Sequence, residues 1–296
     1  MATAENSGTF GVHVVDIVDG NVPGTSRRGS ETEGTSHCRP TASRAVGQGL
    51  VTDQAGYVGL MSLSVLPQSH HQTRWVPLPG STIVTLLRHG ASQGFTPGQP
   101  FPLVDGHGDP ALAQSGHEQA ILAGRRLAAQ HRGAGEDWAA RIEALYVTSL
   151  TRTHETAAPL AKALGLTPMV EVDLREVFLG DWEAGLFRQK AAEAHPAALR
   201  AIEAGEWGEI PGAESTAQLT ARVMGSLNRL ADAHRNQRIV CVVHGGVIAA
   251  ALNDITGSPS FLGAENASLS TIVHDGQRWR LRSFNDTAHL DGGWSA

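Results

Sequence analysis

Thr82-Ile83-Val84-Thr85-Leu86-Leu87-Arg88-His89-Gly90 is a run of apolar and β-branched residues that ends in an Arg-His-Gly triplet. The run is typical of a buried strand, and the glycine allows the chain to turn directly after it. In an open α/β sheet, ligands bind beyond the carboxyl ends of the strands, which is where Arg88 and His89 would lie. An arginine fork fits phosphate oxygens, and a neutral histidine ring can act as a nucleophile. Alone the triplet is a weak signal, because a strand can also end in two polar residues without any function.

A second arginine occurs where another predicted strand, 144–147, is followed by a predicted helix over residues 150–164. The segment that joins them is Thr148-Ser149-Leu150-Thr151-Arg152-Thr153-His154-Glu155-Thr156-Ala157, which places Arg152 in the first helical turn. That end of a helix favours negative charge, so a cation there is best explained by an anion that binds beside it. The alternative is an ordinary surface arginine. Thr148 is expected to cap the helix rather than to react.

A charged segment follows the predicted strand 169–172. It is Leu174-Arg175-Glu176-Val177-Phe178-Leu179-Gly180-Asp181-Trp182-Glu183. One carboxylate in such a loop can act as a general acid. Most acidic loop residues are simply solvated, and the spacing does not choose between Glu176, Asp181 and Glu183.

The most strand-like run of the chain, 238–243, ends in His244-Gly245-Gly246. Its continuous apolar residues indicate a central strand that is buried on both faces, with a helix over 246–255 after it. Backbone N–H groups and the helix dipole make such a turn suitable for an anion. A lone histidine at this position is usually structural, but two strands of one sheet that both end in His-Gly favour a shared site.

From Ser81 onward predicted strands and helices alternate, which indicates a layered α/β sandwich. Capping-box patterns at Ser115 and Ser215 predict the starts of two further helices. A hairpin of strands 269–274 and 278–284 is expected near the C-terminus. The inward face of the helix that begins at Ser115 is predicted to comprise Ala120, Ile121, Gly124, Leu127 and Ala128.

Residues 1–80 differ from the rest, because glycine, serine, threonine and histidine are scattered there without a sustained helical or strand period. We expect a mostly disordered N-terminal extension, with a regulatory or docking segment as the alternative. The folded domain is expected over residues 81–290, followed by a C-terminal tail over 291–296. Met61 would also serve as the start of a shorter chain.

The composition limits the class of protein. With 296 residues, of which 41% are hydrophobic, the chain is long enough for one large domain with a core. A net charge of -6 and a pI near 6.1 argue against a general nucleic-acid-binding protein. An apolar run of about 18 residues and a signal peptide are both missing, and two cysteines, Cys38 and Cys241, cannot form a disulfide framework. We expect a cytoplasmic protein that binds neither membranes nor nucleic acid.

Together these segments resemble the histidine phosphatase superfamily, also called the phosphoglycerate mutase-like family, over residues 81–290. The resemblance rests on an ordered set of motifs, which are Leu-Arg-His-Gly, Arg-x-x-x-Thr-Ala, Arg-Glu followed by Gly-Asp-Trp-Glu, Gly-Ala-Glu-Ser, and Val-His-Gly-Gly. It implies a three-layer α/β/α sandwich with a mostly parallel central sheet.

The resemblance also implies a role for each matched residue. His89 would be the nucleophile that becomes phosphohistidine, Glu176 would be the general acid and base, and His244 would act with them. The phosphate-binding residues would be Arg88, Arg152 and Gly245, together with His244. No metal ion or cofactor is implied, because arginines and a histidine supply the positive charge.

The chain departs from the family pattern after the Arg-His-Gly triplet. The family often has an acidic residue and a threonine there and an asparagine further on, whereas this chain has Ala91, Ser92 and Phe95. Either one polar contact to the phosphate is lost, or another residue of the loop 93–110 supplies it. This loop is rich in glycine and proline and is expected to rim the site.

The implied activity is metal-independent hydrolysis of phosphomonoesters by a histidine acid-type phosphatase. The alternatives are a phosphoglycerate mutase, which uses the same phosphohistidine, and a phosphate-binding module without catalysis. Mutases of the family resemble one another in a basic, proline-rich insert after the acidic loop. Between Glu183 and Glu214 this chain has only three lysines and arginines, which are Arg188, Lys190 and Arg200. A phosphatase is therefore favoured over a mutase.

The sequence does not identify the substrate, which we expect to be a small phosphorylated compound such as a phosphosugar or a phosphoglycerate derivative, or a phosphoprotein. Several aromatic residues either flank the pocket or belong to the core, and they are Phe95, Phe101, Trp182, Phe187 and Trp207. The edge of the C-terminal hairpin offers a surface for a homodimer.

Overall fold

A computed structural model describes residues 51–52, 58–59, 75–258 and 263–290. The chain divides into two units, residues 1–71 and residues 72–296. In the first unit, β1 (Val51–Thr52) pairs antiparallel with β2 (Val58–Gly59). The rest of the predicted extension, including Cys38 and Met61, and the predicted tail lie almost wholly outside the described residues and stay predictions.

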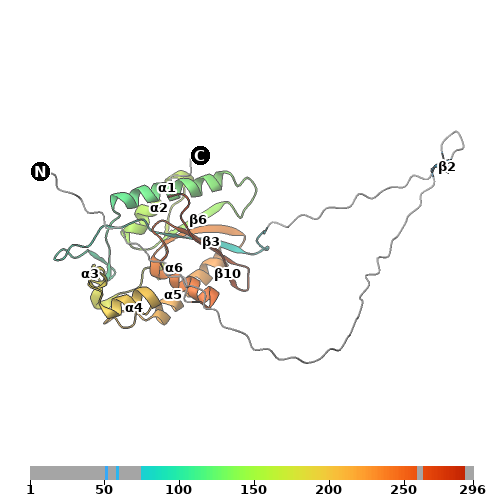
Figure 1. Cartoon of the computed structure of the whole chain (residues 1–296). Coiled ribbons are helices and arrows are strands. Elements are labelled where there is room, and N and C mark those ends of the chain that lie inside the picture. The colour runs from blue at the N-terminus through green and yellow to red at the C-terminus, as the bar shows by residue number, and fades with distance from the viewer. Residues whose placement is uncertain (1–50, 53–57, 60–74, 259–262, 291–296) are drawn as a thin grey trace, which may run out of the picture. The chain divides into compact units, whose positions relative to one another are not determined.

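The second unit is built on a six-stranded sheet in the order β10-β9-β3-β8-β6-β7 (Figure 1). The pairs β3–β8, β8–β6 and β6–β7 are parallel, while β9 and β10 are antiparallel additions at one edge. A mostly parallel central sheet is thereby confirmed. The strands are β3 (Thr82–Arg88), β6 (Ile142–Val147), β7 (Met169–Val170), β8 (Gln237–Val243), β9 (Leu269–His274) and β10 (Trp279–Asp286).

Helices cover both faces of this sheet, which gives the three predicted layers. Against one face pack α1 (Gln114–Arg132) and α2 (Thr151–Leu164), and against the other α5 (Thr216–Ala233) and α6 (Gly245–Thr256). Successive side chains of the central strands point to opposite faces of the sheet. Cys241 of β8 therefore belongs to the α5–α6 core, whereas Val242 belongs to the α1–α2 core. Burial raises the pKa of the Cys241 thiol, as expected for an inert core cysteine.

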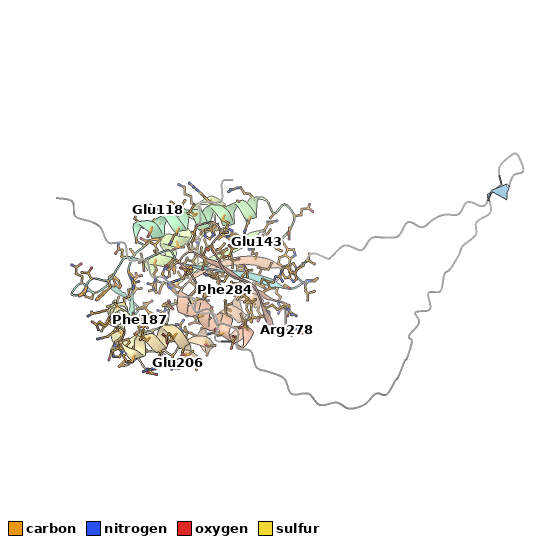
Figure 2. The ribbon with its side chains drawn as sticks, in the orientation of Figure 1. Glu118, Glu143, Phe187, Glu206, Arg278 and Phe284 are labelled. Carbon is orange, nitrogen blue, oxygen red and sulfur yellow. The ribbon has the colours of Figure 1, made fainter. Side chains whose placement is uncertain are left out.

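Two shorter helices, α3 (Leu186–Ala192) and α4 (Pro196–Ala204), lie together at one end of the domain (Figure 1). They belong to a segment, residues 180–213, that we call the cap. The cap has a small hydrophobic cluster of its own, formed by Trp182, Ala197, Ala198, Ala201 and Ile210. In Figure 2 the labelled Phe187 marks this end of the domain, and Phe284 of β10 packs against the α5–α6 core. In the part of the chain that the structure describes, no helix is long and apolar enough to cross a membrane.

The predicted start of α1 is wrong in detail. The helix begins at Gln114, and its N-cap residue, Ala113, makes no side-chain cap. The Ala113 N–H instead donates to the carbonyl of Ala91, and Gly116 packs so closely that an added Cβ would lie 2.0 Å from the same oxygen. A tertiary contact therefore sets this helix start in place of a Ser115 capping box. Ile121, predicted to face inward, is 41% exposed.

The second capping box is confirmed. Ser215 is the N-cap of α5, its hydroxyl accepts from the Gln218 N–H, and the Gln218 amide oxygen accepts from the Ser215 N–H. The predicted end of α2 is also confirmed, because Gly165 adopts a φ of 68° directly after the helix. The small strands β4 (Leu103–Val104) and β5 (His107–Gly108) lie within the predicted rim loop.

Candidate active site

Two adjacent parallel strands deliver the two His-Gly turns to the same place. β3 and β8 run in register, with Arg88 opposite Val243, so the next residue of each strand, His89 and His244, are neighbours. Their ring centroids are 5.1 Å apart, and the His89 N–H donates to the Val243 carbonyl over 2.9 Å. Backbone pairing between the two hydrophobic strands thus fixes the position of one histidine relative to the other.

The His89 ring is held in one orientation and one tautomer. Its Nδ1 lies 2.7 Å from the Gly90 carbonyl oxygen, which can only accept, so Nδ1 carries the proton and Nε2 keeps its lone pair. The side chain is 6% exposed, and burial together with the charges of Arg152 and Arg88 lowers its pKa well below the usual range. The ring is therefore neutral at neutral pH, as a nitrogen nucleophile must be.

Backbone contacts hold the turn after His89. The Gly90 N–H donates to Thr156 Oγ1 over 3.0 Å, and Asn266 Nδ2 donates to the His89 carbonyl over 3.0 Å. An added Cβ at Gly90 would lie 2.4 Å from the Gly116 carbonyl oxygen, so only glycine fits. The threonine of the Arg-x-x-x-Thr-Ala motif thus supports the nucleophile turn from α2.

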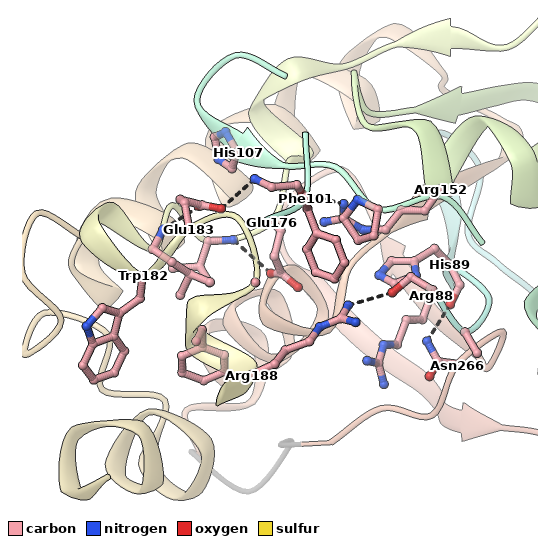
Figure 3. Close-up of a pocket in the computed structure, with 18 of the residues that line it drawn as sticks. Arg88, His89, Phe101, His107, Arg152, Glu176, Trp182, Glu183, Arg188 and Asn266 are labelled. Atoms are coloured by element: carbon pink, nitrogen blue, oxygen red, sulfur yellow. Dashed lines mark hydrogen bonds between the residues drawn. The ribbon is translucent and has the colours of Figure 1, made fainter. Parts of the chain in front are cut away.

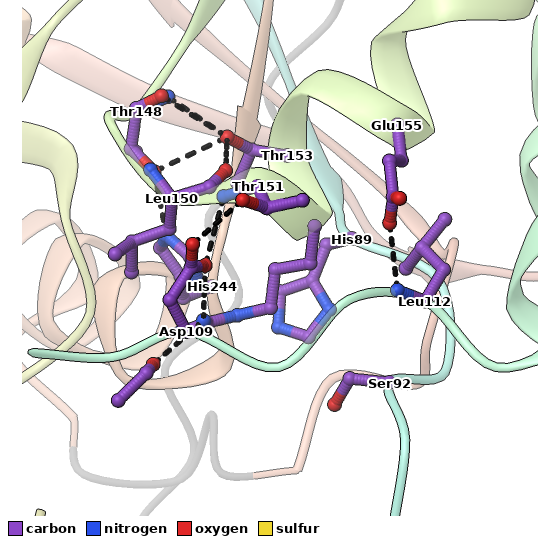
Figure 4. A network of polar contacts seen from close by, with 12 residues as sticks. His89, Ser92, Asp109, Leu112, Thr148, Leu150, Thr151, Thr153, Glu155 and His244 are labelled. Carbon is purple, nitrogen blue, oxygen red and sulfur yellow. Dashed lines mark hydrogen bonds and ion pairs between the residues drawn. The ribbon is translucent and has the colours of Figure 1, made fainter. Parts of the chain in front are cut away.

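Arg152 enters the site from the first turn of α2, as predicted. Its guanidinium donates to the Gly108 carbonyl over 3.1 Å and lies 3.7 Å from Asp109. Asp109 also accepts from the N–H and the hydroxyl of Thr151, at 2.8 and 2.6 Å, and so ties the helix start to the rim loop (Figure 4). Sequence reasoning missed Asp109, because no local pattern connects it to residues about forty positions away.

The His244 ring packs edge-on against that of His89, and His244 is fully buried. Its Nε2 lies 3.0 Å from Thr148 Oγ1, a contact that also overturns the prediction of Thr148 as a helix cap, since Leu150 is the N-cap of α2 (Figure 4). Within the described residues, His244 Nδ1 and Arg88 Nε are buried and have no hydrogen-bond partner. An oxyanion bound beside the nucleophile would give Arg88 Nε a partner, and would do the same for His244 Nδ1 in the tautomer in which His244 Nε2 accepts from Thr148.

Arg88 ends β3 with its guanidinium donating to the Ala264 carbonyl. Burial lowers its pKa, while the nearby carboxylates of Glu176 and Glu265 act in the opposite direction. Gly245 lies against it, because a Cβ added there would be 3.5 Å from Arg88 Nε. That is an ordinary contact distance, so Gly245 is a neighbour of the arginine but glycine is not required there for space.

The structure separates the three candidate acids of the 174–183 segment. Glu183 uses both carboxylate oxygens on backbone N–H groups, those of Leu179 and Gly108. Asp181 is exposed and does not line the cavity. Glu176 lines it, and the Glu176 oxygen Oε1 accepts from its neighbour Val177 at 2.9 Å. Glu183 lines the cavity too, but its two oxygens accept backbone bonds of 2.8 and 2.6 Å. Glu176 Oε2 has only a 3.4 Å contact, so Glu176 is the carboxylate more available to a ligand.

The start of α6 fixes the Glu176 carboxylate. The Gly246 N–H lies 3.1 Å from Glu176 Oε1 and 3.4 Å from Oε2, and a Cβ at Gly246 would come within 2.5 Å of Oε1. The second glycine of the Val-His-Gly-Gly motif is therefore needed for close approach of the acid to the helix end.

Arg222 of α5 clamps the loop that carries Glu176. It donates five hydrogen bonds, three to the carbonyls of Asp173, Arg175 and Glu176 and two to the Glu214 carboxylate. Glu214 also accepts from the Phe178 N–H at 2.9 Å. All donors of the guanidinium are thus engaged, and the glutamate of the Gly-Ala-Glu-Ser motif completes the clamp.

Replacing Arg222 with lysine is expected to lower the free energy of unfolding by about 2–4 kcal/mol, because several part-buried acceptors lose a charged partner. Urea denaturation monitored by tryptophan fluorescence measures this loss. Arg229→Lys is the matched control on the same helix, since Arg229 is exposed and forms surface ion pairs with Glu171 and Asp173, and its change should stay within about 1 kcal/mol. Equal changes in both variants would contradict the clamp.

The site contains a cavity of about 400 Å³ (Figure 3). Four of the predicted site residues line it, namely Arg88, His89, Arg152 and Glu176, whereas His244 and Gly245 do not. Apolar side chains form another part of the cavity wall. Phe101 comes from the rim loop, Val177 and Leu179 come from the 174–183 segment, and Trp182, Phe187 and Trp207 come from the cap. No group of three or more His, Cys, Asp or Glu side chains suited to a metal ion occurs among the described residues.

Phe95 does not line the cavity. Its ring packs against Phe101, with centroids 5.8 Å apart, and covers Gly185 of the cap, where an added Cβ would lie 2.2 Å from it. Arg188 of α3, by contrast, does line the cavity. Sequence reasoning counted Arg188 only as one of three basic residues between Glu183 and Glu214, and it missed the place of Arg188 in the site.

Comparison with known proteins agrees with this arrangement. Residues 84–287 match the family model of the histidine phosphatase superfamily (branch 1). A protein of Arabidopsis thaliana named metal-independent phosphoserine phosphatase is 32% identical over 212 residues, which cover 71% of this chain and 83% of the relative. Phosphoglycerate mutase-like protein 4 of the same plant is 31% identical over 215 residues, covering 70% and 86%.

Comparison with solved structures also finds a phosphatase with the same fold. A mycobacterial glucosyl-3-phosphoglycerate phosphatase complexed with VO3 superposes with a TM-score of 0.56 and 28% identity, covering 69% of this chain and 99% of that one. The chain therefore belongs to the histidine phosphatase superfamily. The phosphatases among its relatives support a phosphoryl hydrolase of the histidine phosphatase type.

Proposed function

We propose that the protein is a metal-independent phosphomonoester hydrolase that acts through a phosphohistidine at His89. One observation carries this proposal. A buried, neutral His89 with a free Nε2 shares one cavity with two arginines, Arg88 and Arg152, and with the Glu176 carboxyl group. Nucleophile, charge stabilisation and acid are the parts that phosphoryl transfer requires.

In the first step, His89 Nε2 attacks phosphorus and the bond from phosphorus to the ester oxygen breaks. Glu176 enters this step protonated and gives its proton to the departing alkoxide oxygen through Oε2, which has the weaker contact to Gly246. The alcohol leaves, and the phosphoryl group stays on nitrogen.

In the second step, water attacks the phosphohistidine. The Glu176 carboxylate takes a proton from the water as its oxygen bonds to phosphorus, and the bond from phosphorus to Nε2 breaks. Inorganic phosphate and neutral His89 result, with Glu176 protonated for the next cycle.

Positive charge for both transition states comes from Arg88 and Arg152, while burial lowers the pKa of His244 well below the usual range and leaves its ring neutral. These groups are already oriented by the protein, so their reorganisation costs little during reaction. They supply the stabilisation that a metal ion provides in other phosphatases, which supports the metal-independent mechanism.

A phosphoglycerate mutase is the second candidate, favoured by the relative named as mutase-like. Its activity would require further cations for a phosphorylated acid. Of the three basic residues between Glu183 and Glu214, only Arg188 lines the cavity, whereas Lys190 and Arg200 form ion pairs with Glu193 and Glu209 outside it. This arrangement favours hydrolysis.

The apolar wall and the size of the cavity favour a small phosphoester whose leaving group has apolar surface. Relatives are named for phosphoserine and for glucosyl-3-phosphoglycerate, which are small phosphorylated compounds. Phosphoproteins fit the 400 Å³ cavity less well, since only a side chain could enter it.

Phosphate release from p-nitrophenyl phosphate in excess EDTA tests the proposal. We expect steady turnover in EDTA, together with an acid-labile, base-stable phosphoenzyme after rapid quenching. Turnover that EDTA abolishes and a divalent metal restores would contradict it. Phosphate transfer between the positions of phosphoglycerate without net release would instead support the mutase.

A further inference from the structure

Arg188 is a third arginine at the cavity, and it comes from the cap rather than from the sheet or α2. Its guanidinium donates to the Gln93 carbonyl over 2.6 Å and to Ser92 Oγ over 2.7 Å. It also lies 5.0 Å from the centroid of the Phe101 ring. These contacts fix the position of a side chain that is otherwise exposed to the open side of the cavity.

The charge of Arg188 has no carboxylate partner. Among the described residues it forms no ion pair, and both of its hydrogen-bond acceptors are neutral oxygens. Arg152, by contrast, lies 3.7 Å from Asp109. The surrounding protein displaces enough water to lower the pKa of Arg188, and the charge of Arg88 adds to the effect. Three arginines thus repel one another across a cavity that a bound dianion would stabilise.

Arg188 is directed at the nucleophile end of the cavity. Ser92, which anchors it, follows His89 by three positions in the same loop. In Figure 3 the side chain extends toward His89 and Arg88 and away from Trp182. Its charge contributes to the lowered pKa of His89, although less than burial, Arg152 and Arg88. The guanidinium keeps donors beyond the two engaged by Gln93 and Ser92.

We propose that Arg188 binds the phosphoryl group that is transferred, and not a charge on the leaving group. This inference rests on the proposed function only in that the phosphoryl group occupies the cavity beside His89. Arg88 and Arg152 approach that group from β3 and α2, and Arg188 approaches it from the cap. Phe95 of the rim loop packs against the cap and does not face the cavity, so it makes no polar contact to the phosphoryl group. Arg188 supplies such a contact from the cap.

Phosphate binding and turnover together test this assignment. Inorganic phosphate carries no leaving group, so isothermal titration calorimetry with phosphate reports the phosphoryl site alone. The variants are Arg188→Met, which keeps the length and removes the charge, and Arg188→Lys, which keeps the charge. Lys190→Met is the matched control on α3, because Lys190 pairs with Glu193 outside the cavity. The esters are p-nitrophenyl phosphate and O-phospho-L-serine, whose leaving group carries a carboxylate.

We expect Arg188→Met to bind phosphate about 10- to 100-fold more weakly than wild type, as for loss of a charged hydrogen bond. The specificity constant, kcat/KM, should fall by similar factors for both esters, Arg188→Lys should recover part of the loss, and Lys190→Met should match wild type.

Unchanged phosphate affinity with a loss confined to O-phospho-L-serine would overturn the assignment and place Arg188 at the leaving group. Wild-type behaviour of Arg188→Met throughout would also overturn it. The two proposals fail separately. Wild-type protein that binds phosphate but hydrolyses neither ester would contradict the hydrolase, while the phosphate affinities would still decide the role of Arg188.

Discussion

Replacing His89 with asparagine is expected to lower kcat for any phosphomonoester by at least about 10⁴-fold, because the variant lacks the nucleophile that lies beside Arg88 and Arg152. Asparagine keeps a polar side chain of similar reach, so the turn held by Thr156 and Asn266 should persist. Phosphate release and rapid-quench trapping measure the loss. The labelled phosphoenzyme should disappear along with turnover.

The control for this variant is His154→Asn. His154 is exposed on the same helix as Arg152 and does not line the cavity, so its replacement should leave turnover unchanged. Thermal unfolding of both variants excludes a general loss of structure. Residual turnover of His89→Asn near the wild-type rate would mean that water attacks the ester directly, and the phosphohistidine mechanism would then be wrong.

Replacing Glu176 with glutamine should produce a loss that depends on the leaving group. An alkyl phosphate leaves as a strongly basic alkoxide and needs the proton, so its kcat/KM should fall by about 10²–10⁴-fold. p-Nitrophenolate leaves without protonation, so its hydrolysis should fall by less than about 10-fold in the first step. A series of substituted phenyl phosphates measures the trend as the slope of rate against leaving-group pKa.

Glu118→Gln provides the comparison, since Glu118 is an exposed residue of α1 that contacts Gln114. Its slope should equal that of wild type. A Glu176→Gln variant with equal losses on alkyl and nitrophenyl esters would remove the acid role from Glu176. In that outcome the carboxylate would serve only to position the start of α6.

The sequence predicted the sheet well, because the strands that matter are long and continuously apolar. In β3 and β8 this pattern also marks where each strand ends, and both ends carry His-Gly. Parallel pairing in register then brings His89 and His244 together, which a linear pattern can anticipate. The start of α5 was also predictable, because the capping box at Ser215 forms as its sequence pattern indicates.

Other features depend on contacts between distant segments and leave no local signal. The start of α1 is set by Ala91 instead of by Ser115, and Thr148 bonds His244 instead of capping α2. The Arg222 clamp and the Asp109 link join residues more than forty positions apart. Arg188 reaches the cavity only because the cap folds over the rim loop. Such pairings are decided by packing, which spacing alone does not encode.

The separate hydrophobic cluster of the cap has a consequence for how this protein could diversify. Trp182 and Ile210 are packed with cap helices, while the histidines and Arg88 are held by the sheet. Substitutions that reshape the cap but keep Arg188 should therefore change the apolar wall of the cavity with little effect on the catalytic residues held by the sheet. Variation in the cap can therefore change which substrate is preferred, while the residues held by the sheet keep the same reaction.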